Sequence, residues 1–212
     1  MSAELLLKEE DVPIRECILE AIHAMRTKAD RRGIELEFRD STPSDLIFKG
    51  DRSLLNQSFK MLIESAVASS PRNSSVMLDS RIDAEGGFCL AIADVAPALP
   101  ENMIRDILGT GPVVKQITPQ VSVSRNTSLT ISRVVAEAHE GRMLLTSTMG
   151  EGTMVRILLP QKRMSSRGKL HQQSTTVLLE SITAAVAGLS PSPPALRSAR
   201  SPVESANSLP RA

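Results

Sequence analysis

One carboxylate at the end of an apolar run is the residue of this chain best placed to do chemistry. Residues 88–93, FCLAIA, are typical of a buried strand, and Asp94 ends that run. Small residues follow at 95–98 and predict a tight turn. A buried carboxylate needs a hydrogen-bond donor, so such an acid often belongs to a binding site. The alternative interpretation is a core aspartate that only caps the turn.

The other residue types that carry chemistry show no catalytic or metal-binding pattern. The histidines and cysteines are scattered and lack metal-ligand spacing; they are His23, His139, His171, Cys17 and Cys89. Ser124 and Ser128 have no histidine and acid arranged with them in sequence. We therefore predict no catalytic residue and no metal site from these patterns.

Composition excludes several classes of function. The 212 residues carry 25 Lys+Arg against 24 Asp+Glu, so no strong field attracts nucleic acid or an anionic membrane. Trp and Tyr are absent, so the aromatic platforms of single-strand nucleic-acid binding are missing. No apolar run reaches about 18 residues, so we predict no membrane span. Two cysteines in apolar contexts predict buried free thiols and a cytoplasmic location.

Hydrophobic periodicity predicts alternating helices and strand pairs. Helices are expected from Pro13 to before Gly33, from Asp51 as N-cap, over 101–108 and over 127–139. Strands are expected at 34–38, 46–48, 76–82, 88–93, 142–148 and 153–159, with a long loop at 109–126. This order predicts an α+β fold, a two-layer α/β sandwich in which helices cover one face of a mixed, mostly antiparallel sheet.

A change in composition predicts the domain boundary. Residues 1–160 form the expected folded domain, and Pro160 closes it. Residues 161–212 begin basic and end rich in Ser and Pro, which predicts disorder. Within them, residues 177–189 are either a short amphipathic helix for docking a partner or an unstructured segment.

Four stretches resemble the catalytic, ATP-binding domain of two-component sensor histidine kinases, the Bergerat-type ATPase fold. DRSLLNQ from Asp51 resembles the helix start DxxRLxQ, and LIESAVASSP from Leu62 resembles LLxNAxKxTP. IADVAPALP from Ile92 resembles VxDxGxGIP. The stretch from Val134 to Pro160 resembles IVExHGGxIxVxSxxGxGTxFxxxLP and is the most specific match. The resemblance covers about residues 10–160.

The resemblance implies an adenine-binding end of a nucleotide pocket. In the family, the acid of VxDxGxGIP accepts the adenine amino group, and Asp94 matches it. The threonine of GxGT lies near the same carboxylate, and Thr153 matches it, with Gly150 and Gly152 in place. ATP with Mg²⁺ is therefore the implied cofactor.

The same resemblance fails at the phosphate end. Ser65 stands where the family has an asparagine that helps to hold Mg²⁺, and Met61 stands one turn earlier in place of Asn or Glu. Ala96 and Ala98 replace two glycines, with Pro97 between them, so close approach of the backbone is lost. The glycines of the second box, GxGxGL, are absent from SRNTSL at 124–129.

These departures predict a degenerate pocket that binds ATP weakly or not at all. Its vestigial nucleotide-binding residues are Asp94, Thr153, Ser65, Ala98 and Gly152. Arg125 in the altered glycine box is expected to be a solvated loop residue, with phosphate pairing as the alternative. His139 is expected at a helix C-terminus, where the helix dipole favours it. His23, in a faint likeness of the phosphoacceptor HExRTP box, is expected to be a solvated surface residue.

Three functions remain open from the sequence. The first is a signalling module of a two-component or phosphorelay pathway that acts through protein contacts. The second is a truncated, active sensor kinase that binds ATP, and the third is an anti-sigma-like or phosphotransfer adaptor. The resemblance implies a response-regulator receiver domain or a phosphoacceptor helical hairpin as partner, and it is compatible with a homodimer. Whether this chain alone has protein-histidine kinase activity is left open.

Overall fold

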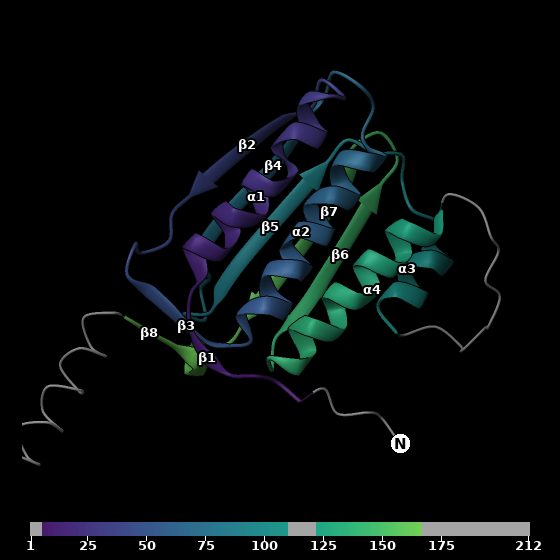
Figure 1. Ribbon diagram of the computed structural model, residues 1–212. Coiled ribbons are helices and arrows are strands. Elements are labelled where there is room, and N and C mark those ends of the chain that lie inside the picture. The colour runs from purple at the N-terminus through teal and green to yellow at the C-terminus, as the bar shows by residue number, and fades with distance from the viewer. Residues whose placement is uncertain (1–5, 110–121, 167–212) are drawn as a thin grey trace, which may run out of the picture. The chain divides into compact units, whose positions relative to one another are not determined.

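The computed structural model describes residues 6–109 and 122–166, which form two layers around one core (Figure 1). One layer is a five-stranded sheet in the order β2-β4-β5-β7-β6. These strands are Glu35–Asp40, Ser75–Ile82, Phe88–Asp94, Gly152–Leu159 and Arg142–Thr148. The other layer contains α1 (Ile14–Asp30), α2 (Arg52–Ser69) and α4 (Ser122–Ala138).

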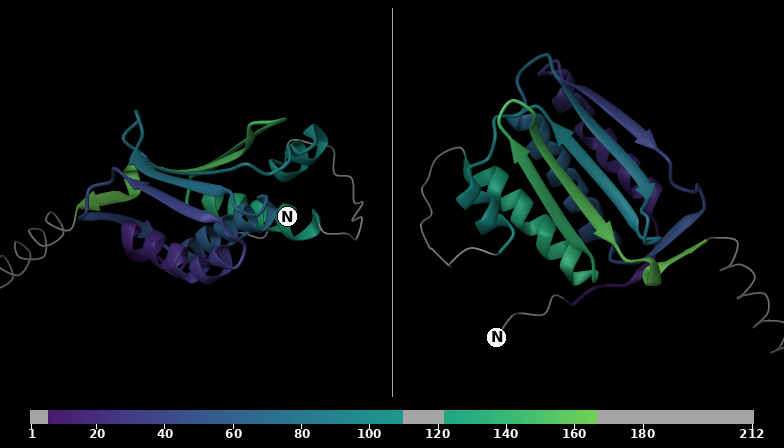
Figure 2. Two further views of the ribbon diagram at one scale, coloured as in Figure 1. Left: turned by 90° about the horizontal axis from the view of Figure 1, so that it is seen from above. Right: turned by 180° about the vertical axis from the view of Figure 1, so that it is seen from behind.

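The helices lie on one face of the five-stranded sheet, and no described helix lies on the other face (Figure 2). β2 pairs with β4 in parallel, whereas the other three pairings are antiparallel. The expected fold class, a two-layer sandwich with a mixed and mostly antiparallel sheet, is therefore confirmed. Central β5 ends at Asp94, which places the candidate acid at the edge of the layer interface.

A second, three-stranded sheet has the order β1-β3-β8 and was not expected. It combines β1 (Glu10–Pro13) with β3 (Leu46–Gly50) and β8 (Met164–Ser166), all antiparallel. A short 3-10 turn, η1 (Gln161–Arg163), precedes β8. Regular structure thus continues past the expected boundary at residue 160, because β3 offers an edge to which the basic segment can pair. The rest of the expected tail, 167–212, lies outside the described residues.

Local sequence explains where the main helices begin and end. The Asp51 carboxylate accepts a hydrogen bond from the Leu54 backbone N–H at 3.0 Å, so the expected N-cap of α2 is confirmed. Gly33 adopts φ +65° after α1, as a helix-ending glycine does. α3 (Glu101–Ile107) lies where it was expected. α4 begins at Ser122, so the latter part of the expected loop 109–126 is helical.

The core lies between the layers and consists mainly of aliphatic side chains with three fully buried phenylalanines, Phe48, Phe59 and Phe88. Both cysteines are buried and free. Burial raises the pKa of the Cys17 thiol to about 11, so it stays protonated and inert near neutral pH.

Candidate functional site

Asp94 lies at the C-terminal end of β5 with its side chain turned to the helical layer. Its neighbours across the sheet are Val76 on β4 and Thr153 on β7, which are both buried. The Asp94 side chain is only 5% exposed. A carboxylate this deeply buried must be compensated by donors, so its partners decide what the site can do.

The principal partner of Asp94 is Arg125, in the first turns of α4. Nη2 of Arg125 lies 3.1 Å from Oδ2 and 3.4 Å from Oδ1 of Asp94. The arginine side chain is itself only 13% exposed. The expectation of a solvated loop arginine is therefore wrong, because the longer α4 carries Arg125 inward to the end of β5. Its guanidinium meets the carboxylate that the resemblance assigns to adenine.

Backbone groups complete the surroundings of the carboxylate. Oδ1 of Asp94 also accepts a hydrogen bond from the Ala96 N–H at 2.9 Å. Burial raises the pKa of Asp94 above its ordinary value, although the Arg125 charge and hydrogen bonds from the backbone of Ala96 and Thr153 oppose the rise. Desolvation therefore has the larger effect on this carboxyl, even with a cation beside it.

Thr153 and Gly152 lie beside Asp94 as expected. The Oγ atoms of Thr153 and Ser147 are 2.8 Å apart, and Ser147 Oγ also accepts the Leu99 N–H at 2.9 Å. Gly152 has φ +100°, and a Cβ there would lie 1.9 Å from the carbonyl oxygen of Asp94. The glycine is therefore required by close packing of β7 against the end of β5, with or without a nucleotide.

The turn after Asp94 has alanines at the two positions where the resemblance expects glycines. Ala96 is 3% exposed and Ala98 is half-buried. Neither adopts a positive φ, so an alanine methyl is tolerated at both positions without backbone strain. The turn keeps one backbone donor on Asp94 and presents methyl groups where the resemblance expects bare backbone.

Two polar atoms between α2 and α4 have no hydrogen-bond partner among the described residues. They are Oγ of Ser65, on α2, and Oδ1 of Asn126, on α4, and both are buried. The two helices run antiparallel and meet where Ser132 Oγ lies 3.4 Å from the Ser58 carbonyl oxygen. Ser65 lies seven residues after Ser58 on α2, and Arg125 lies seven residues before Ser132 on α4. Because the two helices are antiparallel, Ser65 lies at the level of Arg125 and Asn126.

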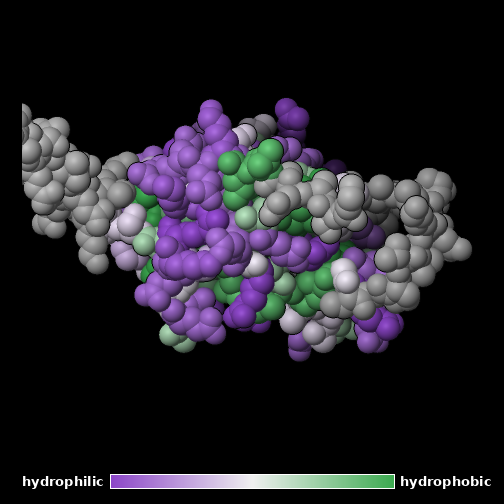
Figure 3. All heavy atoms as spheres, turned by 90° about the horizontal axis from the view of Figure 1, so that it is seen from below, coloured by the Kyte–Doolittle hydropathy of each residue, from purple (hydrophilic) through white to green (hydrophobic). Residues whose placement is uncertain are grey.

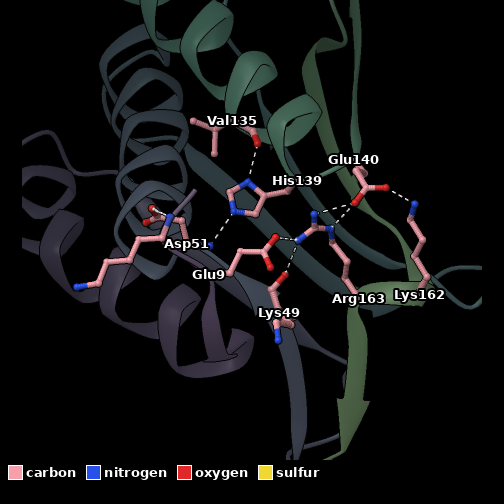
Figure 4. A network of polar contacts seen from close by, with 9 residues as sticks. Glu9, Lys49, Asp51, Val135, His139, Glu140, Lys162 and Arg163 are labelled. Atoms are coloured by element: carbon pink, nitrogen blue, oxygen red, sulfur yellow. Dashed lines mark hydrogen bonds and ion pairs between the residues drawn. The ribbon is translucent and has the colours of Figure 1, made fainter. Parts of the chain in front are cut away.

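His139 belongs to a separate polar cluster beyond the far end of α4 (Figure 4). The ring is fully buried; Nε2 lies 2.9 Å from the Asp51 backbone N, and Nδ1 lies 2.7 Å from the Val135 carbonyl oxygen. Because a backbone N–H can only donate, Nε2 is the acceptor and Nδ1 carries the proton. Burial lowers the pKa of His139, so the expectation of a histidine held by the helix dipole is corrected to a neutral, structural one.

Charged residues lie on the solvent side of the buried His139. Arg163 forms ion pairs with Glu9 at 2.6 Å and Glu140 at 2.7 Å, and it donates to the Lys49 carbonyl oxygen at 3.1 Å. Lys162 also pairs with Glu140. Hydrophilic side chains predominate on this end of the molecule, seen from below in Figure 3. The cluster joins the segment before β1 to the segment before β8, and its role is structural.

The remaining sequence expectations for the site have mixed outcomes. His23 is exposed on α1, as expected. Residues 110–121 of the expected loop 109–126 lie outside the described residues. Within residues 6–109 and 122–166, no three His, Cys, Asp or Glu side chains form a metal-binding group. Over the same residues, no helix has both the length and the apolarity that crossing a bilayer demands.

Comparisons with known proteins find sequence relatives among histidine kinases. No family model matches the chain. The histidine protein kinase DivJ of Caulobacter vibrioides is 28% identical over 149 residues, which are 69% of this chain and 24% of DivJ. The sensor-like histidine kinase SenX3 of Mycobacterium tuberculosis is 29% identical over 162 residues, which are 74% of this chain and 38% of SenX3. The chain spans about a quarter to two fifths of the length of these curated relatives.

Solved structures of histidine kinases share the fold. The nucleotide-free catalytic domain of ThkA matches with a TM-score of 0.61 at 18% identity, over 73% of this chain and 96% of that one. A mycobacterial sensor histidine kinase, MprB, matches with 0.59 at 22% identity, over 72% and 97%. Full-length ShkA in complex with AMPPNP matches with 0.61 at 20% identity, over 74% and 32%. The chain is therefore related in sequence to histidine kinases and has the fold of their catalytic, ATP-binding domain, which confirms the resemblance.

Proposed function

We propose that this chain is a histidine-kinase-type ATPase domain of a two-component or phosphorelay pathway, with a degenerate nucleotide pocket, that acts through protein contacts. The observation that carries the proposal is the contact between Arg125 and Asp94. The carboxylate that would accept the adenine amino group is engaged by a cation from the same chain.

Competition at Asp94 opposes adenine binding. A nucleotide that used this carboxylate would have to displace the Arg125 guanidinium from a position where both side chains are more than four-fifths buried. Removing one partner of a buried ion pair costs about 3–5 kcal/mol, because the other charge is left uncompensated. The hydrogen bond from a neutral amino group to a carboxylate returns about 1.5–3 kcal/mol. The exchange is unfavourable at this end of the pocket.

The residues at the phosphate end do not fit a magnesium triphosphate. Mg²⁺ requires oxygen ligands in near-octahedral geometry and is bound by carboxylates, phosphates and water. Ser65 offers one hydroxyl where the family has a carboxamide, and Met61 offers a thioether. The family's glycine box at the start of α4 is replaced by SRNTSL, so bare backbone is not available to approach phosphates. We therefore derive no step of phosphoryl transfer for this chain.

A second candidate, an active ATP-binding kinase domain, is favoured by one observation. Ser65 Oγ and Asn126 Oδ1 are buried and unpartnered among the described residues, and native proteins leave few such atoms unsatisfied. A bound ligand could supply the missing hydrogen bonds. If Arg125 swings away from Asp94 when a nucleotide binds, the adenine end becomes available as well.

Calorimetric titration of the 212-residue chain with ATP and Mg²⁺ separates the two candidates. The degenerate pocket predicts no binding in the micromolar range. Micromolar binding that is lost in Asp94→Asn would overturn the degenerate pocket and favour the active kinase domain. His23→Ala, an exposed change on α1, is the matched control and leaves the result unchanged in either case.

The proposed partners are a response-regulator receiver domain or a phosphoacceptor helical hairpin, in the reducing cytoplasm where the free thiols of Cys17 and Cys89 persist. The proposal predicts that binding of such a partner does not require nucleotide. Titration of a purified receiver domain and of a purified hairpin into the chain, with and without ATP and Mg²⁺, tests this. Binding that appears only with nucleotide contradicts a purely adaptor-like role.

A further inference from the structure

The outer face of the five-stranded sheet is a surface that the pocket does not use. It is the face seen from behind in Figure 2, where no described helix covers the strands. Along the central strand β5 this face presents Cys89, Ala91 and Ala93, since the alternate residues point to the helical layer. Longer side chains flank β5 and border a shallow hollow of about 210 Å³; its lining is Met77, Asp79, Arg81, Ala91, Ala93, Met154 and Arg156.

The apolar content of this face is unusual for a surface in water. Met77 is 37% exposed, Met154 is 40% exposed and Leu144 on edge strand β6 is 39% exposed. A sheet face that remains solvated normally carries polar side chains at such positions. Methionine adapts to different partners and is frequent at binding surfaces. The face therefore has the character of an interface.

One charge on the face lacks a counter-charge. Arg81 pairs with Asp79 on the same strand, and both are partly exposed. Arg156, two strands away from Asp79, forms no ion pair or hydrogen bond with any residue that the structure describes. Any occupant of the hollow must place an acceptor near Arg156 to avoid burying an uncompensated cation.

The register of the strands makes the face complementary to itself. Met77, Ala93 and Met154 are cross-strand neighbours in one row, and Asp79, Ala91 and Arg156 form the next row. A two-fold axis that runs along β5, between two copies packed face to face, exchanges β4 with β7. It sets Met77 opposite Met154 of the second copy and Asp79 opposite its Arg156.

We propose that this sheet face is a homodimer interface with its two-fold axis along β5. Asp79 of each copy, which also pairs with Arg81 of its own chain, faces Arg156 of the other copy, so two Asp79–Arg156 pairs form across the dimer. The alanines meet at the axis and let the sheets approach to the spacing of about 10 Å that is usual for packed sheets.

The same two-fold axis also sets outer strand β2 of one copy opposite outer strand β6 of the other. The axis sets Glu37 on β2 opposite Thr146 of β6, and Arg39 opposite Leu144. The next row sets Arg81 opposite Leu158. No two like charges face one another in these rows. An unrelated partner would need to match this pattern by chance, whereas a second copy matches it by symmetry.

This inference does not rest on the proposed pocket. The Asp94 side chain points from β5 toward the helical layer, where it meets Arg125 of α4, whereas the dimer face lies on the other side of the sheet. A chain that binds ATP tightly could still dimerise in this way, and a chain that remains monomeric could still have a degenerate pocket.

Sedimentation velocity on the 212-residue chain and on two charge variants tests the proposal. Wild type is expected to reach twice the chain mass of 22.9 kDa in the micromolar range. Arg156→Glu and Asp79→Arg are each expected to raise the dimer dissociation constant by about tenfold or more, because each sets two pairs of like charges face to face. An equimolar mixture of the two variants is expected to recover a dimer, since every facing pair is again of opposite charge.

The recovery in the mixture separates an interface from a folding defect, because two damaged monomers do not repair each other. Arg26→Glu, an exposed charge change on α1, is the matched control and should leave the wild-type dimer intact. Three results would overturn the proposal. These are a wild type that stays monomeric into the high micromolar range, a dimer that survives either substitution, and a mixture that remains monomeric.

Discussion

A side chain near each end of α4 contacts an aspartate: His139 accepts from the Asp51 backbone N–H, and Arg125 pairs with the Asp94 carboxylate. The two contacts differ in how completely the polar groups around them are satisfied. Beyond the C-terminal end, His139 uses both ring nitrogens, one on the Asp51 N–H and one on the Val135 carbonyl. Near the N-terminal end, Arg125 pairs with Asp94, while Ser65 Oγ and Asn126 Oδ1 are buried without partners in the described chain. The first arrangement is complete without a ligand, whereas the second leaves two buried polar atoms that no described residue satisfies.

The largest loss of stability is expected from a change at His139, whose two ring nitrogens both have partners. His139→Ala should lower the free energy of unfolding by about 2–4 kcal/mol, since it leaves a cavity and strips the buried Asp51 N–H of its acceptor. Urea unfolding measures the change. His23→Ala, at an exposed position, should cost less than about 0.5 kcal/mol. Equal losses in the two variants would show that the cluster in Figure 4 does not hold the domain together.

A smaller loss of stability is expected from a change at Arg125, near the N-terminal end of α4. Arg125→Ala should destabilise the fold by about 1–3 kcal/mol at neutral pH. This is less than the ~3–5 kcal/mol for a fully buried pair, because removal of the long arginine side chain admits water to Asp94. Protonation of Asp94 relieves the cost, and its pKa is already raised by burial, so the loss should shrink as the pH falls. In the double variant Arg125→Ala/Asp94→Asn the loss at neutral pH should also be smaller. A loss that does not depend on pH would mean that Arg125 contributes by packing alone.

The unfolding free energy of wild type should depend on pH through the protonation of His139. Its pKa in the folded state is lowered by burial, whereas in the unfolded chain it is about 6.5. The unfolded state therefore binds more protons between the two values, so this contribution is complete above about pH 6.5 and is lost as the pH falls through the folded-state pKa. Comparing unfolding of wild type and His139→Gln across this range isolates the contribution. A histidine stabilised by the helix dipole would give the opposite slope.

The smallest effect is expected on the exposed side of the His139 cluster. Lys162→Ala removes an exposed ion pair with Glu140, and Arg163 still holds that carboxylate. The change in unfolding free energy should be smaller than in any variant above and should vanish at high salt, because exposed pairs are screened. A large, salt-independent loss would show that this pair, rather than buried His139, organises the cluster.

The sequence was sufficient to predict the layers, the N-cap at Asp51 and the position of Asp94, because these depend on local periodicity and on a motif. It was not sufficient for β1 and β8, since neither has a strong pattern and both depend on the edges of β3. The partners of Arg125 and His139 lie 31 and 88 residues away in the chain, so no local pattern could reveal them. A hint was present in the arginine at position 125, because it lies in the altered glycine box while the acid of a separate motif, Asp94, is retained.

The affinity of wild type and of Arg125→Ala for ATP with Mg²⁺, measured side by side by calorimetry, tests the central claim most directly. If Arg125 occupies the adenine-binding carboxylate of a degenerate pocket, wild type shows no micromolar binding. Arg125→Ala then gains weak adenine-nucleotide binding that Asp94→Asn removes. Micromolar binding by wild type that Arg125→Ala weakens would contradict the account and would make Arg125 a ligand of the nucleotide.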